Sequence, residues 1–203
     1  MALMQCNFFS ETLQISSSML VIIPQETQKQ IGMKGMARKD KHPVLYLLHG
    51  LSDDHTIWLR RTSIERYASE KGIAVVMPAV GRSYYANMKS GAGNYWDFLT
   101  KELPFLVRSF FHISSAREDN FVAGLSMGGY GAFKFALSFP EIFCAAASLS
   151  GAVDADAIYK ERVKPGNGNE LQSIFGTKVK DTENDLFYLA EELKKIQKTE
   201  IPK

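Results

Sequence analysis

The sequence is poor in cysteine, and its two cysteines lie far apart. Cys6 and Cys144 match no metal-binding or redox motif, because such motifs place their ligands a few residues from one another. We therefore expect no metal and no cofactor. Two free thiols are typical of a reducing cytosol, and the first residues lack the basic and long apolar regions of a secretory signal. These observations predict a cytoplasmic protein.

An excess of charge and a long apolar run are also missing. The 203 residues carry 24 Lys and Arg against 22 Asp and Glu, a formal net charge of +2. This balance gives no argument for nucleic acid or an anionic membrane as a partner. No apolar run has the length of a membrane span. A hydrophobic content of 45% suits a globular protein, and the length predicts one domain over residues 1–203.

The most informative stretch is Asn120–Gly131, which reads NFVAGLSMGGYG. It predicts a short apolar strand, a tight Gly-x-Ser-x-Gly turn and a helix, the arrangement of a nucleophile elbow. Glycine at positions 124 and 128 avoids clashes in such a turn and leaves the Ser126 hydroxyl exposed. The Met127 N–H faces the same space, where a helix N-terminus favours developing negative charge. The alternative is a glycine-rich turn with a bystander serine, but the flanking strand and helix favour catalysis by Ser126.

A second stretch predicts the rest of an oxyanion hole. Val44–Leu48 is a continuous apolar run, as expected for a central strand covered on both faces. It leads into His49-Gly50-Leu51, and serine hydrolases of this architecture place an oxyanion donor in the turn after such a strand. Gly50 lets the backbone turn, so we expect the Leu51 N–H to face Ser126. The His49 side chain is expected to brace this loop through hydrogen bonds.

Several residues are candidates for a substrate pocket. We place His49, Gly50, Trp58, Tyr84 and Tyr85 there. The two tyrosines lie in a long loop after a predicted strand, and such loops line the ligand crevice of open α/β sheets. For these tyrosines, packing on the loop surface is an equally good interpretation.

The rest of the chain predicts a mostly parallel sheet with helices on both faces, because strands and helices alternate. The expected strands and loops are an antiparallel hairpin of Phe8–Leu13 and Met19–Pro24 around Gln14–Ser18, a surface loop at Gln25–Lys41, strands at Ile73–Met77 and Phe143–Leu149, and an irregular segment at Lys164–Lys180. The expected helices are one with capping-box spacing at Thr62–Glu65 that stops at Gly72, Tyr95–Phe111 kinked at Pro104, a short one at Asp154–Val163, and Glu183–Lys198 before a strand approach at Thr199–Lys203.

At Val44–Trp58 and Asn120–Phe135 the chain resembles the esterase D / tributyrin esterase family of α/β-hydrolases. The residues that carry the resemblance are VLYLLHGL from Val44, Trp58, and AGLSMGGYGAF from Ala123. The resemblance extends over the whole chain. It implies an α/β-hydrolase fold and hydrolysis of short-chain acyl esters, with a small-molecule ester as substrate. It also implies Ser126 as nucleophile, with Leu51 and Met127 as backbone oxyanion donors.

The sequence departs from this family in its histidines. The triad of this fold runs Ser, then Asp or Glu, then His along the chain. All four histidines here precede Ser126, namely His42, His49, His55 and His112. We therefore expect a chain that is incomplete at its C-terminus and lacks the last strands and helix, with the triad acid and base beyond residue 203.

Three expectations follow from this departure. The 203-residue chain alone should be essentially inactive, and an exposed sheet edge should favour a homo-oligomer or a complementing second chain. Among the resident residues, His55 is best placed by topology to act as a base, but we expect it to be an exposed loop residue. Asp154 and Asp156 are expected to be solvated residues at a helix start.

Two other functions stay open. An S-formylglutathione hydrolase-like thioesterase has a very similar elbow, and it requires basic residues near the rim, where Arg82 and Lys89 are candidates. A non-catalytic hydrolase-fold protein would explain the missing histidine. The elbow and oxyanion loop argue against that alternative, because strained and specialised turns have no use in a scaffold.

Overall fold

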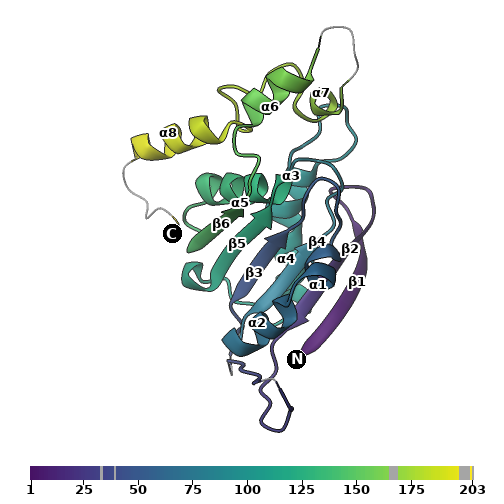
Figure 1. The fold of residues 1–203 in the computed structure, drawn as a ribbon, viewed down its shortest axis with the longest axis vertical. Coiled ribbons are helices and arrows are strands. Elements are labelled where there is room, and N and C mark those ends of the chain that lie inside the picture. Colours follow the sequence, from purple (N-terminus) through teal and green to yellow (C-terminus); the bar gives the residue numbers. More distant parts are fainter. Residues whose placement is uncertain (33, 39, 165–168, 197–201, 203) are drawn as a thin grey trace.

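A six-stranded mixed sheet forms the centre of the molecule, with strand order β1-β2-β4-β3-β5-β6 (Figure 1). The computed structural model describes residues 1–32, 34–38, 40–164, 169–196 and 202. The strands are β1 Ala2–Ser10, β2 Ile15–Ile23, β3 Val44–Leu48, β4 Ala74–Pro78, β5 Asn120–Leu125 and β6 Ala145–Leu149. β1 and β2 pair antiparallel, as do β2 and β4, and the other pairs are parallel. The predicted α/β-hydrolase-like sheet with an N-terminal hairpin is confirmed.

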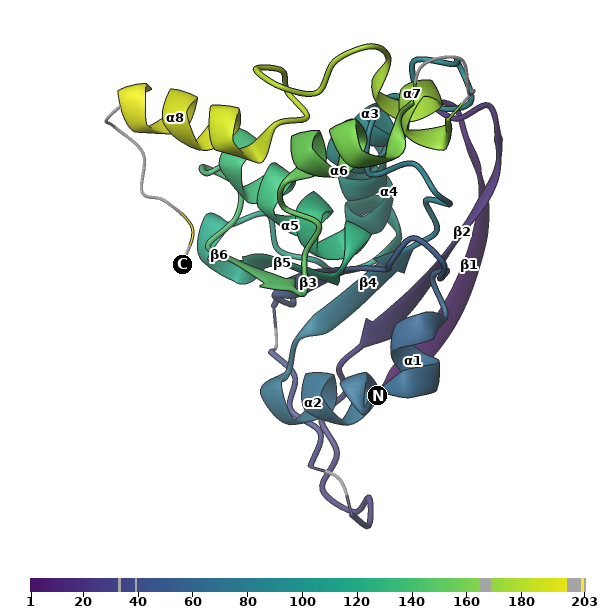
Figure 2. The ribbon, with the colours of Figure 1, turned by 45° about the horizontal axis from the view of Figure 1, so that its top comes forward.

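Helices cover both faces of this sheet (Figure 2). They are α1 Ile57–Arg61, α2 Ile64–Lys71, α3 Tyr95–Asp97, α4 Leu103–Phe110, α5 Met127–Ser138, α6 Ala155–Arg162, α7 Glu170–Phe175 and α8 Leu186–Ile196. One face carries α1 and α2, and the other carries α3, α4 and α5, with α6 to α8 beyond them. Among the described residues, none of the helices combines the length and the apolar character that crossing a bilayer requires.

The central strands bury side chains on both faces, so each face has its own core. In β4, Ala74 and Val76 join the core under α5, whereas Val75 and Met77 join the core under α2. This alternation follows from the two-residue period of a strand. It explains why the central strands read as continuous apolar runs in the sequence.

The hairpin forms as predicted, but its turn lies earlier in the chain. Ser16–Ser18 belong to β2 and pair with Asn7–Phe9 of β1. The chain reverses at residues 11–14 because the Glu102 carboxylate accepts hydrogen bonds from the Glu11 N–H (2.9 Å) and the Thr12 N–H (3.1 Å). A partner 90 residues away in the sequence therefore selects the turn.

The segment expected as one kinked helix is divided into three parts. Between α3 and α4 lies a π-helical turn, Phe98–Glu102, and Pro104 sits in the first turn of α4. Proline has no N–H, so the first turn of a helix is where it fits without losing a hydrogen bond. In this segment Phe98, Leu99, Leu103 and Val107 are buried in the core, whereas Phe110 is exposed.

Helix boundaries differ from prediction at a few other places. The segment 164–180 was expected to be irregular, but α7 forms there because the Asn169 side chain accepts a hydrogen bond from the Leu171 N–H (2.9 Å). α2 ends at Gly72 as predicted, but its N-cap, Ser63, makes no side-chain capping bond. The expected strand approach at Thr199–Lys203 lies outside the described residues, apart from Pro202.

Candidate active site

Ser126 occupies a strained turn between β5 and α5. Its backbone angles are φ 55° and ψ −113°, a combination that residues with a side chain rarely adopt. The turn is held by three hydrogen bonds, from the Ser126 N–H to the Leu149 carbonyl (2.9 Å) and from the Tyr130 and Ala152 N–H groups to the Ser126 carbonyl (3.0 and 3.1 Å). Ser126 itself is exposed. The geometry is that of the predicted nucleophile elbow.

Close backbone contacts explain the glycines on either side of the serine. A Cβ at Gly124 would lie 2.3 Å from the carbonyl atoms of Gly128. A Cβ at Gly128 would lie 2.3 Å from the Leu48 carbonyl oxygen. These neighbours are main-chain atoms and cannot rotate away. Gly124 is therefore required for β5 to pack against the start of α5, and Gly128 for the elbow to pack against β3.

The His49–Leu51 loop lies directly beside the serine. A Cβ added to Gly50 would be 3.8 Å from the Ser126 Cβ and 2.9 Å from an Asp53 carboxylate oxygen. Within the part of the chain that the structure describes, no hydrogen bond occupies the Leu51 N–H or the Met127 N–H. Both amide donors are thus unoccupied, as the predicted oxyanion hole requires.

His49 fixes the orientation of this loop, as predicted. Its Nε2 accepts a hydrogen bond from the Val80 N–H (3.2 Å), so the proton is on Nδ1, which donates to the Gly50 carbonyl (2.8 Å). The Gly50 carbonyl and the Leu51 N–H belong to one planar peptide and point in opposite directions. The imidazole therefore sets the direction of the Leu51 N–H. Burial lowers the pKa of His49, which keeps the ring neutral.

Replacing His49 should show how much this brace contributes. We expect His49→Phe to lower the free energy of unfolding by about 2–3 kcal/mol, because the buried Val80 N–H and Gly50 carbonyl both lose a partner. His49→Asn should lower the free energy of unfolding by less, since the amide nitrogen of asparagine can replace Nδ1 as the donor to the Gly50 carbonyl. Urea denaturation of both variants measures the difference. Equal losses would show that the Gly50 hydrogen bond contributes nothing.

Three other predicted pocket residues are packed into the structure around the loop. Trp58 donates its indole N–H to the Leu48 carbonyl (3.1 Å), and the Tyr85 hydroxyl donates to the His49 carbonyl (2.8 Å). Tyr84 packs its ring against Tyr130 and Phe175. Both loop tyrosines are buried, so the interpretation that they pack on the surface is wrong. That these side chains also contact substrate stays a prediction.

None of the four histidines is arranged as a base for Ser126. Both ring nitrogens of His49 are engaged. His55 is half-buried rather than exposed, and its ring nitrogens have no partner among the described residues, so no carboxylate orients it. His42 and His112 lie where β3 and β5 begin, at the opposite end of the strands from Ser126.

The candidate acids and the rim cation have other partners. Asp154 caps α6 by accepting from the Ala157 N–H (2.9 Å), and Asp156 pairs with Lys160 (2.6 Å).

Arg82 donates from two nitrogens to the Glu170 carboxylate and also to the Leu51 carbonyl (3.3 Å). The ion pair of Glu170 with Arg82 was not predicted, because the residues around position 170 give no indication of a partner 88 residues earlier. Within the described chain, no cluster of three metal-binding side chains exists.

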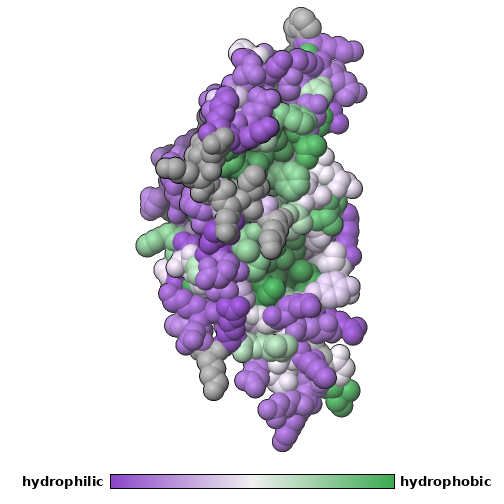
Figure 3. Space-filling model, turned by 90° about the vertical axis from the view of Figure 1, so that its left-hand side faces the viewer, coloured by the Kyte–Doolittle hydropathy of each residue, from purple (hydrophilic) through white to green (hydrophobic). Residues whose placement is uncertain are grey.

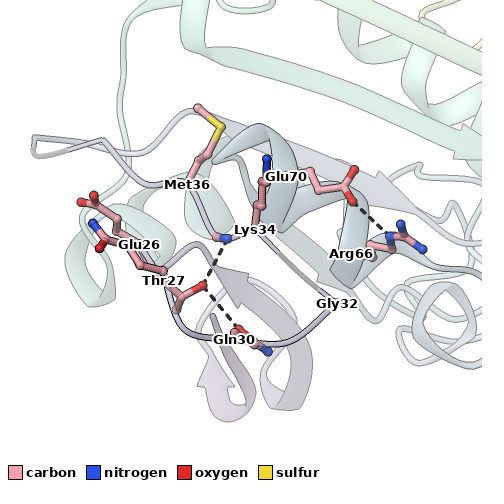
Figure 4. A pocket seen from close by; sticks show the side chains of 10 residues that line it. Glu26, Thr27, Gln30, Gly32, Lys34, Met36, Arg66 and Glu70 are labelled. Carbon is pink, nitrogen blue, oxygen red and sulfur yellow. Dashed lines mark hydrogen bonds and ion pairs between the residues drawn. The ribbon is translucent and has the colours of Figure 1, made fainter.

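A separate hollow, lined by none of the predicted site residues, is seen from close by in Figure 4. It is a groove of about 750 Å³ between the loop at 26–36 and α2, next to the start of β4. The described residues that line it are Glu26, Thr27, Gln28, Gln30, Gly32, Lys34, Gly35, Met36, Arg66 and Glu70. They include no serine, cysteine or histidine.

Solved structures with a similar fold are serine hydrolases. The substrate-bound serine hydrolase FphF of Staphylococcus aureus superposes with a TM-score of 0.84 and 38% identity, covering 99% of this chain and 76% of that one. The S-formylglutathione hydrolase FrmB of the same species superposes with a TM-score of 0.80 and 37% identity. The match covers 100% of this chain and 77% of that one.

Curated relatives include an acetyl esterase, an S-formylglutathione hydrolase and mycobacterial diacylglycerol acyltransferase/mycolyltransferases. An acetyl esterase of Caldicellulosiruptor saccharolyticus is 32% identical over 153 residues, 75% of this chain and 57% of that protein. The S-formylglutathione hydrolase of Paracoccus denitrificans is 34% identical over 126 residues, 52% of this chain and 44% of that protein. The chain thus spans about half the length of these curated relatives.

The family assignment rests on a match that is much longer than the elbow. The sequence profile described as putative esterase matches residues 13–200, nearly the whole chain. The match includes β3, the His49–Leu51 loop, the elbow and α5. The chain belongs to the putative esterase family.

Proposed function

We propose that this chain carries the nucleophile and oxyanion hole of a carboxylesterase that hydrolyses short-chain acyl esters. The observation that supports this most directly is the exposed, strained Ser126 beside two unoccupied amide N–H groups. The relatives named acetyl esterase and S-formylglutathione hydrolase favour an acyl group of one or two carbons. A tributyrin-type substrate, a cytoplasmic location and a homo-oligomer stay predictions.

The chemistry would proceed through an acyl-enzyme. The Ser126 Oγ attacks the ester carbonyl as its proton passes to a base, and the Leu51 and Met127 N–H groups stabilise the tetrahedral oxyanion. The alcohol then leaves, and water hydrolyses the acyl-serine. Because no resident histidine is arranged as the base, we propose that the triad acid and base come from outside these 203 residues.

A thioesterase acting on S-formylglutathione is the second candidate. It is favoured by the FrmB structure, which is 37% identical and covered over 77% of its length. Against it, Arg82, one of the two expected rim cations, is neutralised by Glu170. Comparing S-formylglutathione with p-nitrophenyl acetate in the assay below distinguishes the two candidates.

Imidazole rescue tests the proposed function. The chain alone should turn over p-nitrophenyl acetate about a million-fold more slowly than a complete triad. Added imidazole should raise the rate by replacing the missing base, and Ser126→Ala should lose this increase. The Ser126→Ala chain also corrects for direct hydrolysis by imidazole. Equal imidazole dependence in both chains would contradict a nucleophilic role for Ser126. Fast turnover without imidazole that Ser126→Ala abolishes would contradict the proposed absence of a resident base.

A further inference from the structure

Two adjacent tyrosines near the His49–Leu51 loop have a backbone conformation that residues with a side chain disfavour. Tyr84 has φ 50° and Tyr85 has φ 53°, both in the left-handed region, and both side chains are buried. Backbone strain of this kind persists only where the surroundings hold it, and it gathers at functional sites. The contacts of Tyr85 show what this strained turn holds.

Tyr85 is fixed to its surroundings at the backbone and at the ring. Its N–H donates to the Ser83 Oγ (3.2 Å), and its carbonyl accepts a hydrogen bond from the Lys134 Nζ (3.3 Å). Its ring lies against Gly131, where an added Cβ would be 2.6 Å from the ring. Lys134 and Gly131 both belong to α5, the helix that begins directly after Ser126. The position of Tyr85 therefore depends on α5.

The hydroxyl of Tyr85 reaches the His49–Leu51 loop. It donates to the His49 carbonyl (2.8 Å), and the His49 Nδ1 donates to the Gly50 carbonyl (2.8 Å). These two carbonyls belong to consecutive planar peptide units, the second of which also contains the Leu51 N–H. Gly50, which joins the two units, has a backbone less restricted than that of other residues. The direction of the Leu51 N–H therefore depends on both hydrogen bonds, one made by Tyr85 and one by His49.

Tyr85 and Lys134 lie in the interior of the molecule. A band of hydrophobic residues reaches the surface on one side of the protein (Figure 3), but these two side chains are 0% and 1% exposed. Burial raises the pKa of Tyr85 well above its usual value, so the hydroxyl keeps the proton that it donates. Side chains without exposed surface influence a reaction through the residues that they contact.

We propose that Tyr85 is a positioning residue for the oxyanion hole and that Lys134 acts through it. Lys134 holds the backbone of Tyr85 against α5, and the Tyr85 hydroxyl holds the His49–Leu51 loop, so that the Leu51 N–H keeps the direction that oxyanion binding requires. Both proposed oxyanion donors are then positioned by one helix, because Met127 is the first residue of α5. This inference rests on the proposed function.

A matched pair of tyrosine variants tests this role. Tyr85→Phe removes the hydroxyl and keeps the ring. In the imidazole-rescued hydrolysis of p-nitrophenyl acetate, it should lower kcat about tenfold or more and leave KM unchanged, because an oxyanion donor acts in the transition state. Tyr159→Phe also removes a hydroxyl that donates to a main-chain carbonyl, that of Gly176 (2.7 Å), but this hydroxyl does not contact the loop. It should leave both constants unchanged.

Amide chemical shifts test the geometry without any turnover. In nitrogen–proton correlation spectra, Tyr85→Phe should move the signals of Gly50 and Leu51. The first peptide unit loses its hydrogen bond, and the second is then free to turn with it. Tyr159→Phe should leave both signals in place. Circular dichroism and thermal unfolding check that the variants remain folded.

A double-mutant cycle tests whether Lys134 acts through Tyr85. Lys134→Met keeps an unbranched side chain and removes the donor to the Tyr85 carbonyl, so it should also lower the rescued kcat. Combined with Tyr85→Phe, it should lower kcat no further, because there is then no hydroxyl to position. Effects that multiply would contradict a route through Tyr85.

The outcomes separate this inference from the proposed function. If imidazole gives the wild-type chain no rate that depends on Ser126, the proposed function fails, and the amide signals alone decide whether Tyr85 positions the loop. Moved amide signals with an unchanged rescued kcat contradict a role in the reaction and leave the proposed function standing. Unmoved Gly50 and Leu51 signals overturn the proposal, as does an equal loss of kcat in Tyr159→Phe.

Discussion

Gly128→Ala is expected to lower the free energy of unfolding by more than about 3 kcal/mol. The added methyl group would lie 2.3 Å from the Leu48 carbonyl oxygen and 2.8 Å from that of His49. Both atoms belong to the strand and turn that position the oxyanion loop, so relieving the clash means moving β3 away from the elbow. Against a total stability of about 5–15 kcal/mol for a typical domain, this loss leaves little margin.

Gly91→Ala is the matched control. Gly91 has φ +79°, and a Cβ there meets nothing within 4 Å. Its substitution should cost only about 1–2 kcal/mol, the penalty for a left-handed residue with a side chain. Urea denaturation of both variants gives the comparison. If the two substitutions lower the free energy of unfolding equally, the contact between the elbow and β3 is looser than the structure shows.

The free energy of unfolding should rise with pH between pH 7 and about 9.5, by up to about 1.4 kcal/mol per pH unit. Lys134, on α5, is 1% exposed. Burial lowers its pKa from 10.5 to about 7, with Glu183 acting in the opposite direction and Lys89 adding to the decrease. Between these two pKa values the unfolded chain binds the proton and the folded chain does not. Raising the pH therefore stabilises the fold.

The surroundings of Lys134 explain why its amino group is tolerated in the interior. Nζ donates to the Asn184 side-chain oxygen (2.7 Å) and the Tyr85 carbonyl (3.3 Å), and it lies 4.2 Å from the centre of the Trp96 ring. These are neutral partners, and among the described residues no carboxylate forms an ion pair with it. Lys134→Met should flatten the pH dependence, whereas Lys101→Met, at an exposed position, should leave it unchanged.

Chemical denaturation at several pH values measures this effect. Above pH 10 the trend should reverse, because burial raises the pKa of Tyr46 to about 12 and also raises those of Tyr85 and Tyr130. There the folded chain retains protons that the unfolded chain has lost, so the fold is destabilised. A wild-type profile that is flat from pH 7 to 9.5 would contradict a neutral Lys134 in the folded chain.

Local sequence patterns predicted the parts of this fold that local contacts determine. The elbow at Gly124–Gly128 and the strand before His49 were recognisable because glycine and apolar residues must stand at those positions whatever surrounds them. The buried His49 was correctly expected to brace its loop. Each of these features is explained by neighbours within a few residues or by the two-residue period of a strand.

The features that were missed depend on distant partners. The hairpin turn is selected by Glu102, α7 is tied to the loop by Arg82, and the buried Lys134 finds Asn184 fifty residues later. Tyr84 and Tyr85 look like loop residues in the sequence, but Tyr84 packs against Tyr130 of α5 and Phe175 of α7, and the Tyr85 hydroxyl donates to the His49 carbonyl. Sequence spacing carries no signal for such contacts.

The Arg82 guanidinium has a consequence for how acyl preference can change. It holds the Glu170 carboxylate at the start of α7 and, from the same group, the carbonyl of Leu51. Helix α7 and Leu51, whose N–H is proposed to bind the oxyanion, are therefore mechanically joined. A substitution that shifts α7 would also move Leu51, so a change made in α7 to alter acyl preference should change the rate as well.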